Sequence, residues 1–436
     1  LPFAVLGLPA LMAFYTGAAL GLTALAASRL RLSAAARICL WAVAWSAAEW
    51  ARGHWMTGFP WNLIGYVWSG GFPGAIAVLQ SVAWVGIYGL GFITVLAASL
   101  LALLGASSLV PLPLVHRSAP LLAAVLLLAV PASIGAARLA LVPPAETSVR
   151  LRLVQPSIPE TVKWDPAATE DNFRRLVELS SAPAAHPLAA IIWPEAAAGF
   201  FLERDDLHRA AIAAIAPKDG SKEGYVLTGA LRATPPAERP TRIWNSVEAI
   251  DPQGAIRARY DKARLVPFGE YVPFSDVLPV KKITPGSIDL SAGPGPRTIA
   301  LPGLPAFSPI VCYEAIFPGA VVDGATRPAW ILNVTNDAWY GRSSGPYQHF
   351  AIARTRAVEE GLPLVRVANN GISGVVDPLG RIVARTGLDS IGYVDVALPK
   401  PAPATIYAVA GDWVFLAMLA LGLVPALWRH RPSRPA

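Results

Sequence analysis

Five apolar runs constrain the fold of this chain more than any other feature of its sequence. They cover residues 2–27, 38–50, 75–104, 119–140 and 406–428. A helix needs about 20 apolar residues to cross a bilayer, which most of these runs supply. The 38–50 run is shorter, but the preceding residues 32–36 can extend it. The sequence therefore predicts membrane-spanning helices on both sides of a long, more polar segment.

The composition agrees with membrane spans and argues against a soluble enzyme or a nucleic-acid-binding protein. Hydrophobic residues make up 54% of the 436 residues, charged residues only 15%, and the mean hydropathy is +0.46. These values are atypical of a soluble enzyme. The net charge of +7 comes from dispersed Lys and Arg with no nucleic-acid-binding motif, so we expect no nucleic-acid partner. Because the chain opens inside an apolar run at Leu1, we expect that N-terminal spans are missing.

Short basic segments predict the topology, because such segments tend to stay in the cytoplasm. They lie at residues 29–37, 116–117 and 429–434, which share one side if every run crosses the membrane. Residues 51–71 and 142–404 then face the opposite side, which is the periplasm in a bacterium. The aromatic loop 51–71 is either a membrane-surface segment or an ordinary interhelical loop.

Three regions are therefore predicted. Residues 1–141 carry about four transmembrane helices, residues 142–404 form an extramembrane domain, and residues 405–436 form a last transmembrane helix with a basic cytoplasmic tail.

The segment 142–404 has the alternating pattern of an α/β domain. DPQG at Asp251–Gly254 and DPLG at Asp377–Gly380 predict turns between paired strands. We expect a layered sandwich of sheets and helices. Expected helices cover residues 169–180, 205–216 and 347–360, and expected strands cover residues 149–154, 190–193, 225–230, 243–250, 255–260, 307–311, 330–334, 364–368, 374–376, 382–385 and 392–396.

Cys312 is the candidate nucleophile, in the stretch FSPIVCYEAIFP. A thiol at the end of a buried strand, followed by a sharp turn, is presented outward from a rigid sheet, as a nucleophile must be. The alternative is a buried cysteine that acts as a small apolar residue. The other cysteine, Cys39, lies far away in an apolar run, so we expect neither a disulfide framework nor a cysteine metal site.

Two charged residues in similar positions strengthen the catalytic interpretation. Glu195 follows the strand in IIWPE, and a partly desolvated carboxylate there can accept a thiol proton. Lys262 follows another strand in RYDK, where an ammonium can favour the thiolate and stabilise an oxyanion. The alternatives are a helix N-terminal Glu195, a solvated Lys262, or a Cys–His pair that uses His349 instead.

Four motifs in this order resemble the nitrilase superfamily with its Glu–Lys–Cys triad: WPE, DK, LVPFGEYVP and VCYE. With the flanking spans and NDAWYG, they resemble one branch closely, the apolipoprotein N-acyltransferases. The resemblance implies a nitrilase-like α-β-β-α sandwich in which Glu195 is the general base, Lys262 stabilises the oxyanion and Cys312 accepts the acyl group. It also implies supporting or substrate-binding positions at Trp164, Glu270, Tyr313, Glu314, Trp339, Tyr340 and the turn 369–371.

The function implied by this resemblance is a two-step acyl transfer. A phospholipid acylates Cys312 to form a thioester, and the α-amine of a diacylglyceryl-cysteine at a lipoprotein N-terminus then takes the acyl chain. The resemblance further implies a multi-pass protein of the bacterial inner membrane, a monomer, with no metal and no cofactor. Apolar loops at 199–202 and 267–280 are hypothesised to dip into the headgroup layer.

Two other functions remain open from the sequence. A membrane-tethered carbon–nitrogen hydrolase, or amidase, can use the same triad on a soluble amide. A transporter or scaffold is the other alternative. Few ionisable residues interrupt the apolar runs apart from Glu49, which argues against a solute pathway.

Overall fold

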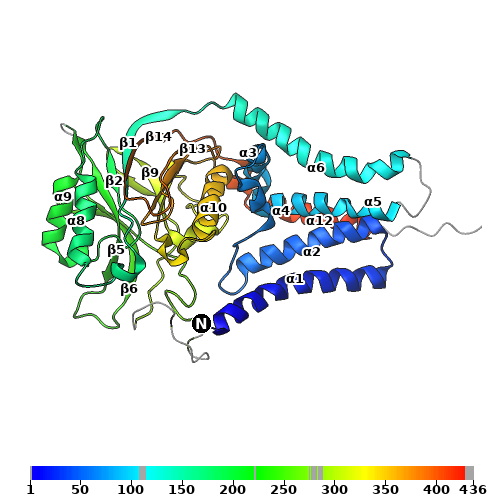
Figure 1. Cartoon of the computed structure of the whole chain (residues 1–436), viewed down its shortest axis with the longest axis horizontal. Coiled ribbons are helices and arrows are strands. Elements are labelled where there is room, and N and C mark those ends of the chain that lie inside the picture. The colour runs from blue at the N-terminus through cyan, green and yellow to red at the C-terminus, as the bar shows by residue number, and fades with distance from the viewer. Residues whose placement is uncertain are drawn as a thin grey trace, which may run out of the picture. The chain divides into compact units, whose positions relative to one another are not determined.

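A computed structural model of the chain describes residues 2–107, 114–219, 222–273, 275, 282 and 288–427. Its contacts divide the chain into two compact units. We call Pro144–Pro403 the α/β unit, and Leu1–Pro143 with Ala404–Ala436 the helical unit. Figure 1 shows the elements of both units, coloured by residue number.

In the helical unit, helices occupy all five apolar runs, but two of the runs are divided among shorter helices. Within the described residues, three helical segments are long and apolar enough to cross a membrane: Leu6–Leu30, Val82–Gly105 and Ser118–Leu141. The elements of this unit are α1 (Pro2–Leu30), α2 (Ala34–His54), the 3-10 helix η1 (Ile64–Ser69), α3 (Ala75–Leu79), α4 (Val82–Leu100), α5 (Ala102–Ser107), α6 (Leu114–Leu141), α11 (Ile406–Ala410) and α12 (Trp413–Leu427).

Two of the predicted spans are interrupted. The run 75–104 divides into α3, α4 and α5, and inside α4 Gly86 adopts φ 65° and ψ 177°. A Cβ at Gly86 would lie 2.3 Å from the Tyr407 ring, so both the conformation and the space favour glycine. The last run breaks at Gly411, between α11 and α12. Residues 116–117 lie at the start of α6 rather than in a loop, and the basic residues 429–434 lie outside the described residues.

Two six-stranded sheets form the α/β unit. The first has the order β14-β1-β2-β5-β6-β7, and the second has the order β13-β12-β11-β10-β9-β8. Their bounds are β1 (Glu146–Gln155), β2 (Ala190–Ile192), β5 (Tyr225–Ala233), β6 (Ile243–Ile250), β7 (Ile256–Asp261), β8 (Ile299–Leu301), β9 (Leu304–Val311), β10 (Trp330–Thr335), β11 (Leu364–Ala368), β12 (Gly374–Val376), β13 (Ile382–Arg385) and β14 (Gly392–Pro399); a separate hairpin pairs β3 (Lys218–Asp219) with β4 (Lys222–Glu223).

Apolar side chains of both sheets meet in a central core, and helices cover the outer faces (Figure 1). Phe173 of α8 and Ile212 of α9 pack on the first sheet, while Phe350 of α10 packs on the second. This arrangement confirms the predicted α-β-β-α sandwich. The helices and 3-10 turns are α7 (Glu160–Lys163), α8 (Thr169–Ser180), α9 (Asp206–Ile215), α10 (Gly345–Glu360), η2 (Leu202–Arg204), η3 (Cys312–Ile316) and η4 (Asp337–Tyr340).

Strand direction explains why the predicted site residues can meet. In the first sheet β1, β2 and β5 are parallel, and β7 returns to the direction of β5 after the antiparallel β6. In the second sheet β9, β10 and β11 are parallel. Glu195, Lys262 and Cys312 each follow the carboxyl end of such a strand, at β2, β7 and β9.

The hypothesis that the loop 199–202 enters the headgroup layer is wrong for Phe200 and Leu202. Leu202 is fully buried, and Phe200 packs against the core and stacks on His208 with ring centroids 3.5 Å apart. Only Phe201 among its aromatic residues is substantially exposed, at 39%. Apolar packing against α8 and α9 takes up these side chains instead. Much of the segment 267–280 lies outside the described residues.

Candidate active site

Cys312 begins the turn η3 directly after β9 and has the left-handed φ of 49°. A non-glycine residue in this region is uncommon and is typical of sharp turns at functional sites. The side chain is nearly buried, with 8% of its surface exposed. The strand-end geometry thus presents the thiol at the edge of the sheet, as its sequence position predicts.

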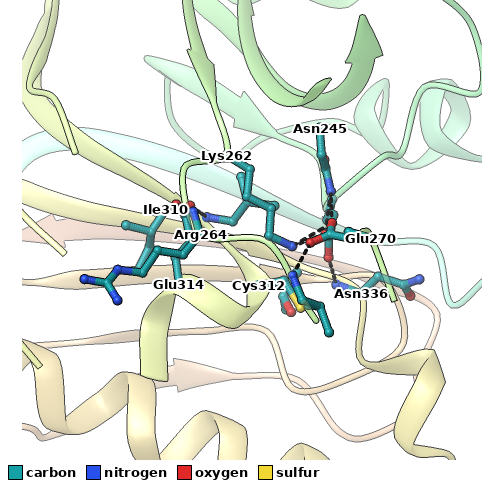
Figure 2. Close-up of polar contacts among 12 residues, drawn as sticks. Asn245, Lys262, Arg264, Glu270, Ile310, Cys312, Glu314 and Asn336 are labelled. Carbon is teal, nitrogen blue, oxygen red and sulfur yellow. Dashed lines mark hydrogen bonds and ion pairs between the residues drawn. The ribbon is translucent and has the colours of Figure 1, made fainter. Parts of the chain in front are cut away.

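Lys262 lies close to Cys312 and contacts the carboxylate of Glu270 (Figure 2). Its Nζ is 2.9 Å from Oε1 of Glu270 and 3.5 Å from Oε1 of Glu195. Burial lowers the pKa of Lys262, but Glu270, Glu195 and the nearby Cys312 outweigh it, so the pKa is raised overall. Lys262 is therefore a permanent ammonium at neutral pH, held by contacts with two carboxylates.

Glu195 is held by donors to both of its oxygens. Asn245 donates from Nδ2 to Oε1 at 2.8 Å, and the main-chain N–H of Asn336 donates to Oε2 at 2.7 Å. Its loop passes close to Gly229, where a Cβ would lie 2.3 Å from the Pro194 oxygen and 2.6 Å from Cα of Glu195. Only glycine at 229 permits this close approach.

The Cys312 thiol is neutral in the resting site. Burial is the main cause that raises its pKa to about 12, the negative charge of Glu195 adds to it, and Lys262 opposes it. A thiol with this pKa is protonated at neutral pH, and only the thiolate is a good nucleophile. Such a cysteine can act as a nucleophile only if a base removes its proton, and Glu195 is a carboxylate that lies at the same edge of the sheets.

Glu314 stabilises the turn at Cys312 by accepting hydrogen bonds from the residues around it. Its Oε1 accepts from Tyr260 O–H at 2.7 Å and from the N–H groups of Ala263 and Arg264 at 2.8 and 3.1 Å. Its Oε2 accepts from the N–H of Val311 at 2.7 Å. These bonds connect the residue before Cys312 to the segment that follows Lys262 (Figure 2). The bonds therefore hold the backbone segments that carry Cys312 and Lys262 in a fixed relative position.

Replacing Glu314 with glutamine is expected to destabilise the α/β unit by about 1–3 kcal/mol, because an amide NH₂ then faces buried N–H donors. Thermal unfolding of the purified protein measures the effect as a lowered Tm. Glu238→Gln, at an exposed loop position, is the matched control and should leave the Tm nearly unchanged. Equal Tm values for the two variants would show that the Glu314 bonds contribute nothing.

His349 is engaged elsewhere and is not a solvated surface residue. It is fully buried, with Nδ1 2.8 Å from Oδ1 of Asp337 and Nε2 3.1 Å from the main-chain oxygen of Cys312. Arg366 donates to the other Asp337 oxygen at 2.7 Å. Burial raises the pKa of Asp337, but Arg366 and His349 outweigh it and hold the pKa low. The ring thus supports the cysteine backbone, and the alternative Cys–His pair finds no support in this geometry.

The remaining predicted residues lie around the triad in different environments. Tyr313 is buried and packs edge-on against Phe317, with ring centroids 5.1 Å apart. Trp164 and Trp339 are exposed by 44% and 50%. Trp164 donates from Nε1 to Glu160 at 3.0 Å.

The turn 369–371 supports the base indirectly. Asn369 donates to the side chain of Asn336 at 3.0 Å, and Asn336 in turn holds Glu195 through its own N–H. Tyr340, on the same 3-10 turn as Trp339, packs edge-on against the His349 ring. These contacts explain why the polar turn and the NDAWYG motif lie beside the site.

Three residues close to the triad were missed from the sequence: Asn245, Asn336 and Lys163. A polar residue inside the apolar strand β6 was a usable signal for Asn245. Asn336 lies in NDAWYG, where its own contact with Glu195 has no local sequence signal. Lys163 is buried and donates from Nζ to the main-chain oxygen of Glu195 at 2.9 Å. Nothing in its local sequence distinguishes it from a surface lysine.

Comparison with known proteins agrees with this fold and site. A family model described as carbon-nitrogen hydrolase matches residues 150–404, and one described as the apolipoprotein N-acyltransferase N-terminal domain matches residues 1–100. The α-β-β-α sandwich with converging Glu, Lys and Cys is thus a carbon–nitrogen hydrolase domain joined to apolar helices.

Curated relatives show which family of carbon–nitrogen hydrolase proteins the chain belongs to. Apolipoprotein N-acyltransferases of Rhodopseudomonas palustris and Bradyrhizobium diazoefficiens are 39% and 41% identical over 99% of this chain and 80% of each relative. That of Rickettsia prowazekii is 36% identical over 95% of this chain and 80% of the relative. The chain belongs to the apolipoprotein N-acyltransferase family. It is accordingly an acyltransferase rather than an amidase, and its apolar helices indicate a bacterial membrane protein.

Among solved structures, an amidase of the nitrilase superfamily from Nesterenkonia is similar at 20% identity, with a TM-score of 0.42. The match covers 63% of this chain and 95% of the amidase.

Proposed function

We propose that this protein moves an acyl chain from a phospholipid, through a thioester on Cys312, to the N-terminal amine of a diacylglyceryl-cysteine in a lipoprotein. The observation that carries the proposal is the convergence of Glu195, Lys262 and Cys312 at one edge of the two sheets. The family supplies the lipoprotein substrate, and the apolar helices supply a reason why both substrates are lipids: neither needs to leave the membrane.

In the first step, Sγ of Cys312 attacks the ester carbonyl of the phospholipid while Glu195 takes the thiol proton. Negative charge moves to the carbonyl oxygen, and the Lys262 ammonium stabilises it. The C–O bond to glycerol then breaks, and Glu195 returns the proton to the leaving alkoxide. The products are a lysophospholipid and the Cys312 thioester.

In the second step, the acceptor amine attacks the thioester carbonyl. Glu195 accepts a proton from the nitrogen, and Lys262 again faces the oxyanion. The C–S bond breaks, an amide forms, and Cys312 regains a proton. A thioester suits this step because amines attack it readily, and a nearly buried Cys312 limits competition from water.

The protein is proposed to be a monomer of the inner membrane that crosses it several times, with the α/β unit on the periplasmic side. The positions of the short basic segments support this orientation. The exposed side chains of Trp164 and Trp339 are proposed to contact the lipid substrates.

The test supplies a defined phospholipid in detergent micelles together with a synthetic diacylglyceryl-cysteine peptide. We expect a triacylated peptide and one lysophospholipid for each peptide, measured by mass spectrometry. Small soluble amides serve as the parallel substrate. Release of ammonia from these amides, with no transfer to the peptide, would instead identify an amidase.

A further inference from the structure

Lys163, at the end of α7, is a buried lysine that the two-step mechanism does not use. Only 8% of its surface is exposed, and charged side chains are rarely this buried unless they are paired. Its Nζ donates to the main-chain oxygen of Glu195 at 2.9 Å, and it lies 5.6 Å from the Trp164 ring centroid. Unlike Lys262, it therefore bonds a carbonyl rather than a carboxylate oxygen.

Cys312 is one of the groups that interact electrostatically with Lys163. The pKa of Lys163 is lowered, with burial as the main cause, and the charges of Glu195, Glu160 and Cys312 oppose this shift. The Glu160 carboxylate is itself held by donors, from Trp164 Nε1 at 3.0 Å and from Asn336 Nδ2 at 2.8 Å. In the part of the chain that the structure describes, Nζ of Lys163 bonds a main-chain oxygen and forms no ion pair with a carboxylate. Charges interact strongly in a buried site of low dielectric constant.

The site needs such a charge when the thiol ionises. Lys262 is shared between Glu195 and Glu270, so its charge is already balanced. A thiolate or a tetrahedral oxyanion adds a further negative charge beside these two carboxylates. The titratable and charged groups that face or adjoin Cys312 come from several elements: Glu195, Lys262, Asp337, Tyr340, Lys163, Tyr313, Glu314 and His349.

We propose that Lys163 is a second ammonium of the site, which stabilises the ionised forms of Cys312 and fixes the backbone of Glu195. It acts as a positioning and electrostatic residue, because it contacts the base rather than the reacting atoms. The inference rests on the proposed role of Cys312 as the nucleophile. It adds a lysine outside the Glu–Lys–Cys set to the groups that set the reactivity of the thiol.

The test measures the rate at which iodoacetamide alkylates Cys312 between pH 6 and pH 10. Cys39→Ser, in the helical unit, serves as the parent because it leaves Cys312 as the only thiol. Lys163→Met removes the charge and the hydrogen bond, whereas Lys163→Gln keeps a donor for the Glu195 oxygen. Lys163→Arg keeps the charge. Lys400→Met, at an exposed position, controls for the loss of a lysine.

We expect Lys163→Met and Lys163→Gln to slow alkylation at pH 8 by about tenfold and to need a higher pH to recover the rate. Lys163→Arg and Lys400→Met should stay within about twofold of the parent. A parent-like pH dependence in both neutral variants would overturn the proposal, and so would an equal loss in Lys163→Arg. Circular dichroism shows which variants fold, and Lys163→Gln carries the test if Lys163→Met does not.

Alkylation needs no lipid, so this experiment fails independently of the proposed function. A parent that is alkylated normally but takes no acyl chain from phospholipid would contradict the proposed function and leave the Lys163 result standing. A parent that is acylated by phospholipid, with neutral Lys163 variants that behave like it, would contradict only the role of Lys163.

Discussion

Cys312→Ala is expected to reduce acyl transfer to below about a thousandth of the parent rate, because the residue that carries the acyl chain is removed. The measurement is the amount of triacylated peptide formed per minute from phospholipid and a diacylglyceryl-cysteine peptide. The protein should still fold, because alanine is smaller than cysteine and fits the same buried space at the start of η3.

Cys39→Ala is the matched control, because it removes the other thiol of the chain from a half-buried position in α2. It should retain the parent rate within about twofold. Substantial transfer by Cys312→Ala would mean that the acyl chain passes directly from lipid to amine, and the thioester mechanism would be wrong.

Glu195→Gln is expected to slow transfer by about 10²–10⁴-fold, the usual contribution of a general base. The amide keeps the size of the carboxylate but cannot take the thiol proton. Burial and the neighbouring charges raise the pKa of Cys312 to about 12, so very little thiolate exists near pH 7 without a base.

The pH dependence gives this variant a distinctive result. Below the raised pKa of Cys312 the thiolate fraction increases with pH, so the rate of Glu195→Gln should rise about tenfold per pH unit between pH 7 and pH 9. Glu178→Gln, an exposed position on α8, should follow the parent profile. A flat, parent-like rate in Glu195→Gln would assign the base to another group.

The sequence located the triad because all three residues share one kind of local pattern. Glu195, Lys262 and Cys312 each follow a short apolar strand, and parallel strands bring their carboxyl ends to one edge. The strand β6 and the helix α8 also begin and end where their periodicity predicted. The local hydrophobic pattern and the direction of the strands are thus enough to predict most elements of the α/β unit.

The groups that tune the triad could not be predicted in the same way. Asn245 bonds Glu195 from strand β6 of the same sheet, and Asn336 bonds it from a turn after β10. Both are more than 40 residues away from Glu195 in the chain. Lys163 has the local sequence of a surface lysine and is buried only by tertiary packing. The sequence does not encode such contacts locally, because they depend on how two sheets pack.

In the helical unit, the sequence predicts the helices but not where they are interrupted. The composition of the apolar runs predicts helices. It does not predict that Gly86 and Gly411 interrupt two of these runs. Glycine within an apolar run is compatible with a continuous helix, so only the packing of Tyr407 against Gly86 distinguishes the two cases.

The most direct test of the central claim is to incubate the protein with a defined phospholipid and no acceptor, and then to measure the intact mass. The mechanism predicts a mass increase of one acyl chain, located on Cys312 by peptide mapping and released by neutral hydroxylamine. The same treatment of Cys312→Ala should give no increase. An unmodified parent chain, or an acyl group that persists in Cys312→Ala, would contradict the thioester on which the proposed function depends.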